Sequence, residues 1–293
     1  MSTLTCVTIS TLVIISLFNM VLLMGIMMQL KQKCEEGVVN IPNNVEFNRL
    51  SSLVNSRRSK SQKPKFMAAL VAIKYNKLIL MCGTTIISKF WILSTAHCCN
   101  TIKDYPSEDV KVSSNSPKWK LGVPHDILDV IIHKNYSPDS ATHNLCLIRV
   151  RQMFKDAYEI PVAIASSRYK YIANSTALAL GWSSEVNDID LDKDDIYSTN
   201  VRLINYEKCR KMFKNHKIDN SMVCGKNYDK NDCNFDSGGP LFQNNVVIGV
   251  VSFETDCANG FFPKVYTRIS FFEDWLKQVE ALKGVKINAV FKS

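Results

Sequence analysis

Residues 231–240 of the chain read NDCNFDSGGP, and this stretch decides how the rest of the sequence is interpreted. It combines a cysteine, an aspartate directly before Ser237 and a tight Gly-Gly-Pro turn, an arrangement that would present a reactive serine hydroxyl. Phe235 departs from that arrangement, because a backbone that must turn sharply there favours glycine. The stretch therefore raises the question of whether Ser237 is a working nucleophile.

Length and charge narrow the classes of protein to consider. The chain has 293 residues, enough for one large domain or two small ones around a substantial core. Its net charge is +9, which favours acidic partners such as sulfated glycans, anionic lipid or nucleic acid. No basic helix and no alternation of basic and aromatic residues stands out, so we expect no nucleic-acid site. An acidic glycan is a candidate partner, and a solvated basic face is the simpler interpretation.

The ten cysteines indicate disulfides more than metal ligands. None forms a CxxC pair, and none is grouped with histidines at the spacing of zinc ligands, so we expect no metal and no cofactor. Loop-sized intervals separate the members of three pairs, Cys82 and Cys98, Cys209 and Cys224, and Cys233 and Cys257. Such pairs suit an oxidising compartment, although reduced core cysteines in a cytosolic protein are the alternative.

The N-terminal segment favours export. It has no charged side chain before Lys31, and its apolar part is long enough to span a bilayer. Without a basic start or a clear cleavage site, residues 1–33 fit a signal-anchor somewhat better than a signal peptide. Lys31 and Lys33 would favour the cytosolic side, but Glu35 and Glu36 weaken that objection. We expect the secretory pathway, with the folded part extracellular or held by one membrane span.

The remaining chain divides into a linker, a long folded region and a tail. Residues 34–65 are polar and irregular, which predicts a linker or pro-segment with Arg57 and Arg58 as a candidate processing site; a merely solvated linker fits equally well. Short apolar or alternating runs between turn-rich segments then indicate an all-β domain over residues 66–285. Helical spacing in ISFFEDWLKQVEAL (269–282) predicts a helix packed on the strands. Residues 286–293 form a short basic tail.

Several separated motifs occur in an order that identifies a family. LSTAHCC (93–99) places a histidine at a strand end, followed by NDCNFDSGGPLF (231–242), GVVSF (249–253), KVYTRI (264–269) and FFEDWL (271–276). Together these motifs, over about Phe66 to Leu282, resemble the chymotrypsin-like serine proteases. The resemblance implies two six-stranded antiparallel β-barrels, a C-terminal α-helix and an active site in the cleft between the barrels.

The resemblance assigns catalytic roles, one of them to an altered residue. His97 matches the general base and Ser237 the nucleophile, and a third group must orient the histidine and stabilise its cation. The family has aspartate at that position, whereas this chain has Asn144 before LCLIRV (145–150). Asp139 would require a slip of five residues that puts polar residues into the apolar strand. Asparagine supplies no charge, and its NH2 group can select the wrong tautomer; replacing the aspartate costs about 10⁴-fold in kcat in this fold.

Two further departures concern the oxyanion site. By resemblance, the backbone N–H groups of Phe235 and Ser237 form the oxyanion hole, and a phenylalanine there predicts a rearranged turn or a covered serine. A tolerated variation with the donor intact is the alternative; loss of one donor costs about 10²–10³ in rate. Asp236 matches the carboxylate that pairs with a freed N-terminal amine in the family. No Ile-Val-Gly-Gly-like segment lies between residues 34 and 66, which predicts a zymogen-like turn.

The specificity pocket departs as well. By resemblance, Glu254 and Lys264 replace two pocket-lining glycines close to Ser252, and Asn231 matches the pocket floor, followed by Asp232. We expect Lys264 to pair with Glu254 or Asp232 and to fill the pocket. In the alternative, both side chains turn to solvent and leave a narrowed site.

By resemblance, Cys82–Cys98 tethers the loop that carries His97, Cys209–Cys224 braces the second barrel, and Cys233–Cys257 holds the pocket wall to the nucleophile loop. Cys34, Cys99 and Cys146 stay unassigned, and the place of Cys146 within an apolar strand predicts a free core thiol. Asn135 and Asn174 begin Asn-X-Ser/Thr sequons, which predict glycosylated surface loops.

The sequence therefore predicts a serine-protease homologue, inactive or severely impaired, that acts by binding a protein or peptide. An active but slow or unusually selective endopeptidase that uses Ser237 and His97 is the alternative. A binder of sulfated glycans is a third and weaker hypothesis.

Overall fold

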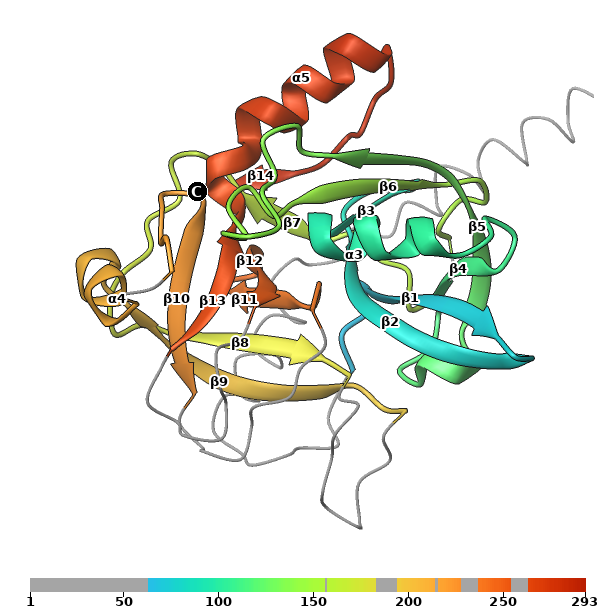
Figure 1. Ribbon diagram of the computed structural model, residues 1–293, viewed down its shortest axis with the longest axis horizontal. Coiled ribbons are helices and arrows are strands. Elements are labelled where there is room, and N and C mark those ends of the chain that lie inside the picture. Colours follow the sequence, from blue (N-terminus) through green and yellow to red (C-terminus); the bar gives the residue numbers. More distant parts are fainter. Residues whose placement is uncertain (1–62, 156, 183–193, 214–215, 228–236, 254–262) are drawn as a thin grey trace, which may run out of the picture. The chain divides into compact units, whose positions relative to one another are not determined.

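Antiparallel strands form two closed rings of six in the described part of the chain (Figure 1). This part comprises residues 63–293 apart from 156, 183–193, 214–215, 228–236 and 254–262 of a computed structural model. The first barrel closes in the order β1-β2-β3-β6-β5-β4. Its strands are β1 (Met67–Lys74), β2 (Lys77–Ile86), β3 (Trp91–Ser94), β4 (Val110–Ser114), β5 (Val123–Ile132) and β6 (Cys146–Val150).

The second barrel follows later in the chain and closes through the pairing of β11 with β12. Its order is β11-β8-β9-β10-β13-β12. The strands are β8 (Thr176–Gly181), β9 (Tyr197–Ile204), β10 (Met222–Asn227), β11 (Pro240–Gln243), β12 (Val246–Phe253) and β13 (Lys264–Arg268). The predicted pair of six-stranded antiparallel barrels is thereby confirmed.

The two faces of strand β1 belong to two different buried clusters, one of which extends across both barrels. Successive residues of a strand point to opposite faces. Leu70 and Ala72 join a buried cluster made by the first barrel alone, whereas Ala69 and Val71 join a cluster that extends into the second barrel. Because both faces of β1 are buried, its sequence is a continuous apolar run rather than an alternating one.

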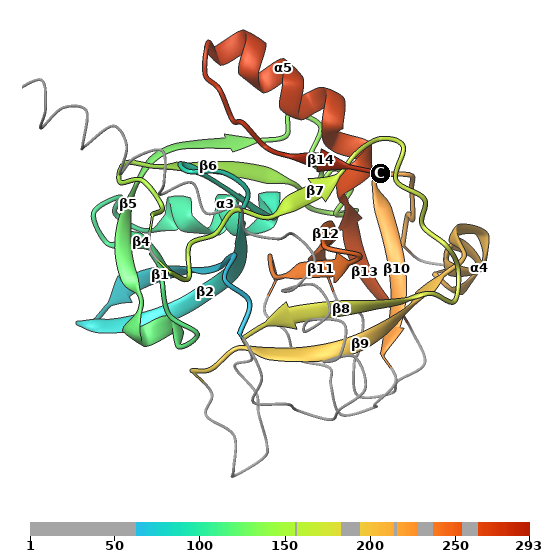
Figure 2. The same ribbon diagram turned by 180° about the vertical axis from the view of Figure 1, so that it is seen from behind.

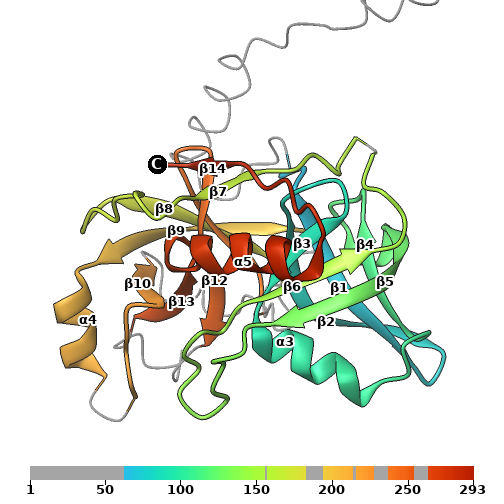
Figure 3. The same cartoon turned by 90° about the horizontal axis from the view of Figure 1, so that it is seen from above.

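Short helices lie at the two ends of the domain. Figure 3 shows α3 beside the first barrel and α4 at the opposite end, beside the second. The helices are α3 (Ala96–Thr101), α4 (Tyr206–Met212) and α5 (Glu273–Lys283), with 3₁₀ turns η2 (Ile102–Asp104), η3 (Trp119–Leu121) and η5 (Ile269–Phe272).

The predicted C-terminal helix is confirmed as α5, which begins after the 3₁₀ turn η5. Phe272, Leu276 and Val279 are buried against the barrels, while Phe271 is 44% exposed. The helix ends at Lys283 and is capped by Gly284, whose φ of 61° lies in the left-handed region that glycine adopts without strain.

The residues after α5 include the segment that was predicted only as a basic tail, and they return along the helix (Figure 2). There β14 (Phe291–Lys292) pairs in parallel with β7 (Ala163–Ala165), which itself pairs in parallel with β12. The carboxylate Oε1 of Glu280 accepts hydrogen bonds from the backbone N–H groups of Ile287 at 2.6 Å and Asn288 at 3.2 Å. Glu280 therefore fixes the start of the tail.

Replacement of Glu280 by alanine is expected to lower the free energy of unfolding by about 1–3 kcal/mol, because two backbone donors lose a charged acceptor. Urea unfolding measures the change. Gln278→Ala, an exposed position on the same helix, is the matched control and should stay within about 0.5 kcal/mol of the parent. Equal losses in both variants would contradict the role of Glu280.

The membrane prediction falls outside this region. Within the described ranges, no helix is long and apolar enough to cross a bilayer. The predicted signal-anchor (1–33), Cys34 and nearly all of the predicted linker (34–65) lie outside the described residues.

Candidate active site

Three different elements position the predicted catalytic residues. His97 lies in the first turn of α3, directly after β3. Thr95 is the N-cap of α3, and its hydroxyl oxygen accepts a hydrogen bond from the backbone N–H of Cys98 at 3.2 Å. Asn144 lies just before β6, and Ser237 precedes β11.

Asn144 is buried, with 2% of its surface exposed, and both polar atoms of its side chain have partners. Its Oδ1 accepts from the backbone N–H of His97 at 2.9 Å, and its Nδ2 donates to Ser252 Oγ at 2.8 Å. Its backbone carbonyl accepts from Thr267 Oγ1 at 2.8 Å. Asn144 thus occupies the place that the strand register predicts, not Asp139, and joins α3 of the first barrel to β12 and β13 of the second.

The hydroxyl of Ser237 faces protein acceptors. Its Oγ lies 3.2 Å from Thr95 Oγ1 and can donate to the carbonyl oxygens of Val251 at 3.3 Å and Ser252 at 3.4 Å. Across the described ranges, the exposed ring of His97 makes no hydrogen bond to Ser237 or to Asn144. The structure therefore brings the three residues into one region without linking the base to the nucleophile.

A tight turn fixes the backbone of Ser237. Gly83 of β2 donates its N–H to the Ser237 carbonyl at 2.8 Å, and Gly238 donates to the Val251 carbonyl at 2.9 Å. Gly238 has a φ of 90°, and a Cβ built there would fall 2.1 Å from the Gly83 carbonyl oxygen. Only glycine fits this approach of the turn to β2.

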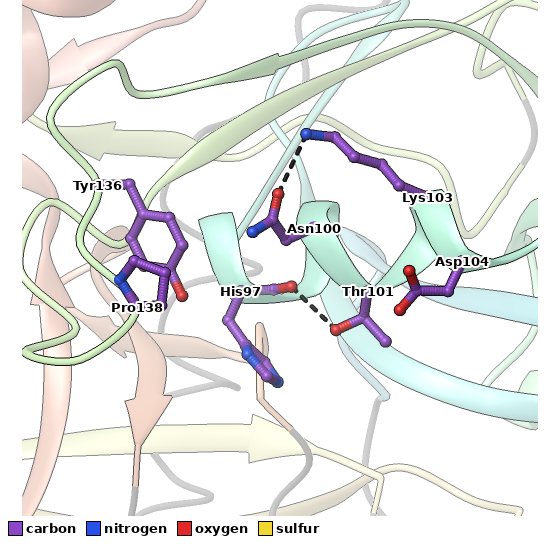
Figure 4. A pocket seen from close by; sticks show the side chains of 7 residues that line it. All are labelled: His97, Asn100, Thr101, Lys103, Asp104, Tyr136 and Pro138. Carbon is purple, nitrogen blue, oxygen red and sulfur yellow. Dashed lines mark hydrogen bonds between the residues drawn. The ribbon is translucent and has the colours of Figure 1, made fainter.

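A pocket of about 370 Å³ lies beside the base (Figure 4). Residues of α3 and η2 form one side of it, and residues of the loop after β5 form the other. Lys103 Nζ donates to Asn100 Oδ1 at 3.1 Å on the first side. The lining residues are His97, Asn100, Thr101, Lys103, Asp104, Tyr136 and Pro138. The pocket combines an aromatic and proline wall with charged groups.

The specificity-pocket prediction is visible only in part. Lys264 opens β13 with 7% of its surface exposed, and Ser252 is 5% exposed. The predicted partners and the rest of the oxyanion loop lie outside the described residues, namely Asn231, Asp232, Cys233, Phe235, Asp236, Glu254 and Cys257.

Two of the predicted disulfides are present, one in each barrel. Cys82–Cys98 joins β2 to α3, and Cys209–Cys224 joins α4 to β10, as the resemblance implies. These bonds agree with folding in an oxidising compartment.

A third disulfide, Cys99–Cys146, joins α3 to β6, so the prediction of a free thiol at Cys146 is wrong. Pairing of β3 with β6 places Ser94, just before α3, opposite Cys146. One helical turn further, Cys99 then comes within reach, at a Cα–Cα distance of 6.5 Å. The spacing of 47 residues along the chain carries no sign of this approach.

Predictions about surface chemistry stay untested. Asn135 and Asn174 both have exposed side chains, so each sequon is accessible, and glycosylation remains a prediction. In the ranges that the structure describes, no three His, Cys, Asp or Glu side chains gather where they could hold a metal ion.

Thr95 is the residue of this site that sequence reasoning missed. Its only signal is the threonine of LSTAHCC, two residues before His97. The partner that gives it meaning, Ser237, lies 142 residues away along the chain.

Comparisons with known proteins agree with this architecture. The family model described as Trypsin matches residues 54–276. The chain is similar to "Trypsin, alkaline B" of Manduca sexta, with 28% identity over 225 residues that cover 74% of this chain and 86% of that protein. It is also similar to Hypodermin-A of Hypoderma lineatum, with 30% identity over 192 residues that cover 64% of this chain and 73% of that protein.

Two solved structures share the fold. Neuropsin, a serine protease expressed in the limbic system of mouse brain, has a TM-score of 0.62 at 23% identity and matches over 74% of this chain and 96% of its own. The scabies mite inactivated protease paralogue S-I1 has a TM-score of 0.63 at 16% identity, over 74% and 95%. The family match covers most of the sequence and the two-barrel fold agrees with it, so the chain belongs to the trypsin family of chymotrypsin-like serine proteases.

Proposed function

We propose that this trypsin-family chain has little or no peptidase activity and acts by binding another protein or a peptide. The observation that carries the proposal is the orientation of the Ser237 hydroxyl, which faces Thr95 and the carbonyls of β12. A serine hydroxyl is a poor nucleophile until a base takes its proton. Here the candidate base, His97, has no hydrogen bond to it in the described structure.

Asn144 supports the same conclusion. During acyl transfer the histidine becomes a cation, which the aspartate of active relatives stabilises. The Asn144 amide has no charge, its NH2 group is bound to Ser252, and its oxygen already accepts from the main chain of His97. Proton transfer therefore lacks its electrostatic support, at a cost of about 10⁴-fold in kcat for this substitution alone.

The substitutions around the substrate pocket add to the proposal. Lys264 is buried at a position where the resemblance implies glycine, in keeping with a pocket filled from within. Phe235, Asn231 and Glu254 depart from the family pattern in sequence. A chain that keeps the fold but changes each of these positions is better suited to recognition than to turnover.

We place the protein outside the cell, through the secretory pathway. Three disulfides support this, and residues 1–33 supply the proposed signal-anchor or signal peptide. Glycans at Asn135 and Asn174 belong to the same proposal. The partner is a protein or peptide, with an acidic glycan as a further candidate because of the net charge of +9.

Covalent labelling tests the proposal. The full chain, Ser237→Ala as the blank and Asn144→Asp are exposed to a fluorophosphonate probe, with bovine trypsin as the active control. We expect labelling of trypsin and, slowly, of Asn144→Asp, in which charge behind His97 is restored, and no labelling of the parent chain. Labelling of the parent chain at Ser237 would contradict the proposal and favour the second candidate.

That second candidate is a slow or unusually selective serine endopeptidase. It is favoured by one observation, the 2.9 Å bond between Asn144 and the His97 backbone, which keeps the strand and the helix in a protease-like relation. A peptide-library digest, analysed by mass spectrometry, distinguishes it by cleavage that disappears in Ser237→Ala.

A further inference from the structure

We infer that the Thr95 hydroxyl is a positioning group that holds the Ser237 hydroxyl away from His97. This inference rests on the proposed function and names one cause of the resting state of the same site. Thr95 Oγ1 lies 3.2 Å from Ser237 Oγ, the shortest of the contacts that the serine oxygen makes in the described structure.

Thr95 is itself held in place. It is 0% exposed and is the N-cap of α3, with its oxygen bonded to the backbone N–H of Cys98. Cys98 is in turn tied to β2 by its disulfide bond with Cys82. Because the cap and the disulfide act on neighbouring atoms, the Thr95 oxygen cannot follow Ser237 if the serine turns.

The backbone of Ser237 is equally fixed, so its side-chain torsion is the freedom that remains. Its carbonyl is bonded to Gly83, and the next residue, Gly238, is bonded to Val251. In this inference, rotation about χ1 is what would turn the hydroxyl from Thr95 toward His97. In the observed orientation the hydroxyl has three neighbouring oxygen atoms, whereas an orientation toward the imidazole offers one nitrogen.

Of the three groups that contact the Ser237 hydroxyl, Thr95 is the one that contributes a side chain and can therefore be changed by mutation. The other two acceptors are backbone carbonyls of β12, which any residue would supply. All three contacts, at 3.2, 3.3 and 3.4 Å, are longer than ordinary hydroxyl hydrogen bonds, so none holds the serine strongly and the loss of the shortest one changes the balance. Removing the threonine hydroxyl should therefore shift Ser237 toward His97.

The test uses the full chain with Asn144→Asp, which restores charge behind the histidine. In this background Thr95→Val removes the hydroxyl with little change of shape, and Thr95→Ser retains it. The probe is diisopropyl fluorophosphate: Ser237 Oγ forms a bond to phosphorus, fluoride leaves, and His97 takes the hydroxyl proton. Intact mass gives the rate, with Ser237→Ala as the blank.

We expect Thr95→Val to raise the rate of phosphorylation about tenfold over Asn144→Asp alone, and Thr95→Ser to leave it unchanged. Rescue by Thr95→Ser, which keeps the hydroxyl but not the methyl group, is the readout that a purely structural effect would not give. Equal rates in the valine and serine variants overturn the inference.

Thr95→Val also removes the N-cap of α3, so a second cap serves as the matched control. Asn205 caps α4 by accepting from the backbone N–H groups of Glu207 at 2.9 Å and Lys208 at 3.2 Å. Asn205→Ala should lower the Tm to a similar extent and leave the rate of phosphorylation unchanged. A rate increase in this control as well would assign the effect to loss of stability and overturn the inference.

Crystal structures of the Thr95 variants decide the matter independently of reactivity. Ser237 Oγ should face His97 in Thr95→Val and keep its present orientation in Thr95→Ser. The present orientation in both overturns the inference. Phosphorylation of the unmodified parent would instead overturn the proposed function, so the two failures are distinguishable.

Discussion

Replacing both Cys99 and Cys146 by alanine is expected to lower the free energy of unfolding by about 4 kcal/mol. The bond closes a loop of 47 residues, and a cross-link of that length removes much conformational freedom from the unfolded chain. Guanidinium unfolding, with the other disulfides intact, measures the loss.

The second-barrel disulfide is a matched control for this prediction. Cys209–Cys224 closes a loop of 15 residues, and all four cysteines are buried, so alanine leaves comparable voids. Its removal should cost about 1 kcal/mol less, because the loop is shorter. Equal losses for the two double variants, or the reverse order, would show that loop length does not govern the stabilisation.

The stability of the protein should fall by about 3 kcal/mol as the pH is lowered from about 6.5 to 4, through His133. This residue is 8% exposed and lies 5.0 Å from the ring of His143 and 5.1 Å from that of Trp275. Burial, then the neighbouring His143 and Lys134, lowers the pKa of His133 from 6.5 to about 4. Its Nδ1 accepts the backbone N–H of Asn135, which only the neutral ring permits.

The direction of this change in stability follows from the pKa of His133 in the unfolded chain, 6.5, and in the folded chain, about 4. Between pH 6.5 and 4 the unfolded chain binds the proton and the folded chain does not, so stability is complete above this window and declines through it. Each unit of difference between the two pKa values changes the free energy of unfolding by about 1.4 kcal/mol. Urea unfolding at pH 7, 5.5 and 4.5 measures the decline.

His133→Leu provides the control, since the difference between parent and variant isolates this one group. Glu273 contributes equally to parent and variant: hydrogen bonds from Lys277 and from the Ser167 backbone lower the pKa of Glu273 from 4.5 to about 2, so its contribution declines from about pH 4.5 downward in both. The same pH profile in the parent and in His133→Leu would contradict the prediction.

Much of the fold was accessible from sequence because its strands are distinctive. Runs such as FMAALVAI keep apolar residues on both faces, and the structure buries both faces of β1. Shorter or more polar strands gave no such signal. In β9 only Thr199, Val201 and Leu203 are buried between partly exposed residues, and β4 is only five residues long.

The part of the site that follows from the register of a single strand was predictable from sequence. The apolar run LCLIRV fixed the register of β6, and the structure places Asn144 beside His97 as that register requires. Contacts between distant segments were not predictable. The Cys99–Cys146 bond and the approach of Thr95 to Ser237 arise only when the strands pair and the two barrels close.

The bonds of Asn144 have a consequence for recognition. The uncharged side chain and the backbone carbonyl of Asn144 tie the helix of His97 to two strands of the other barrel. These three bonds hold α3 in a fixed relation to β12 and β13. Preorganised surfaces lose little conformational entropy on association. Under the proposed function, the helix of His97 is thus already held in place when a partner binds.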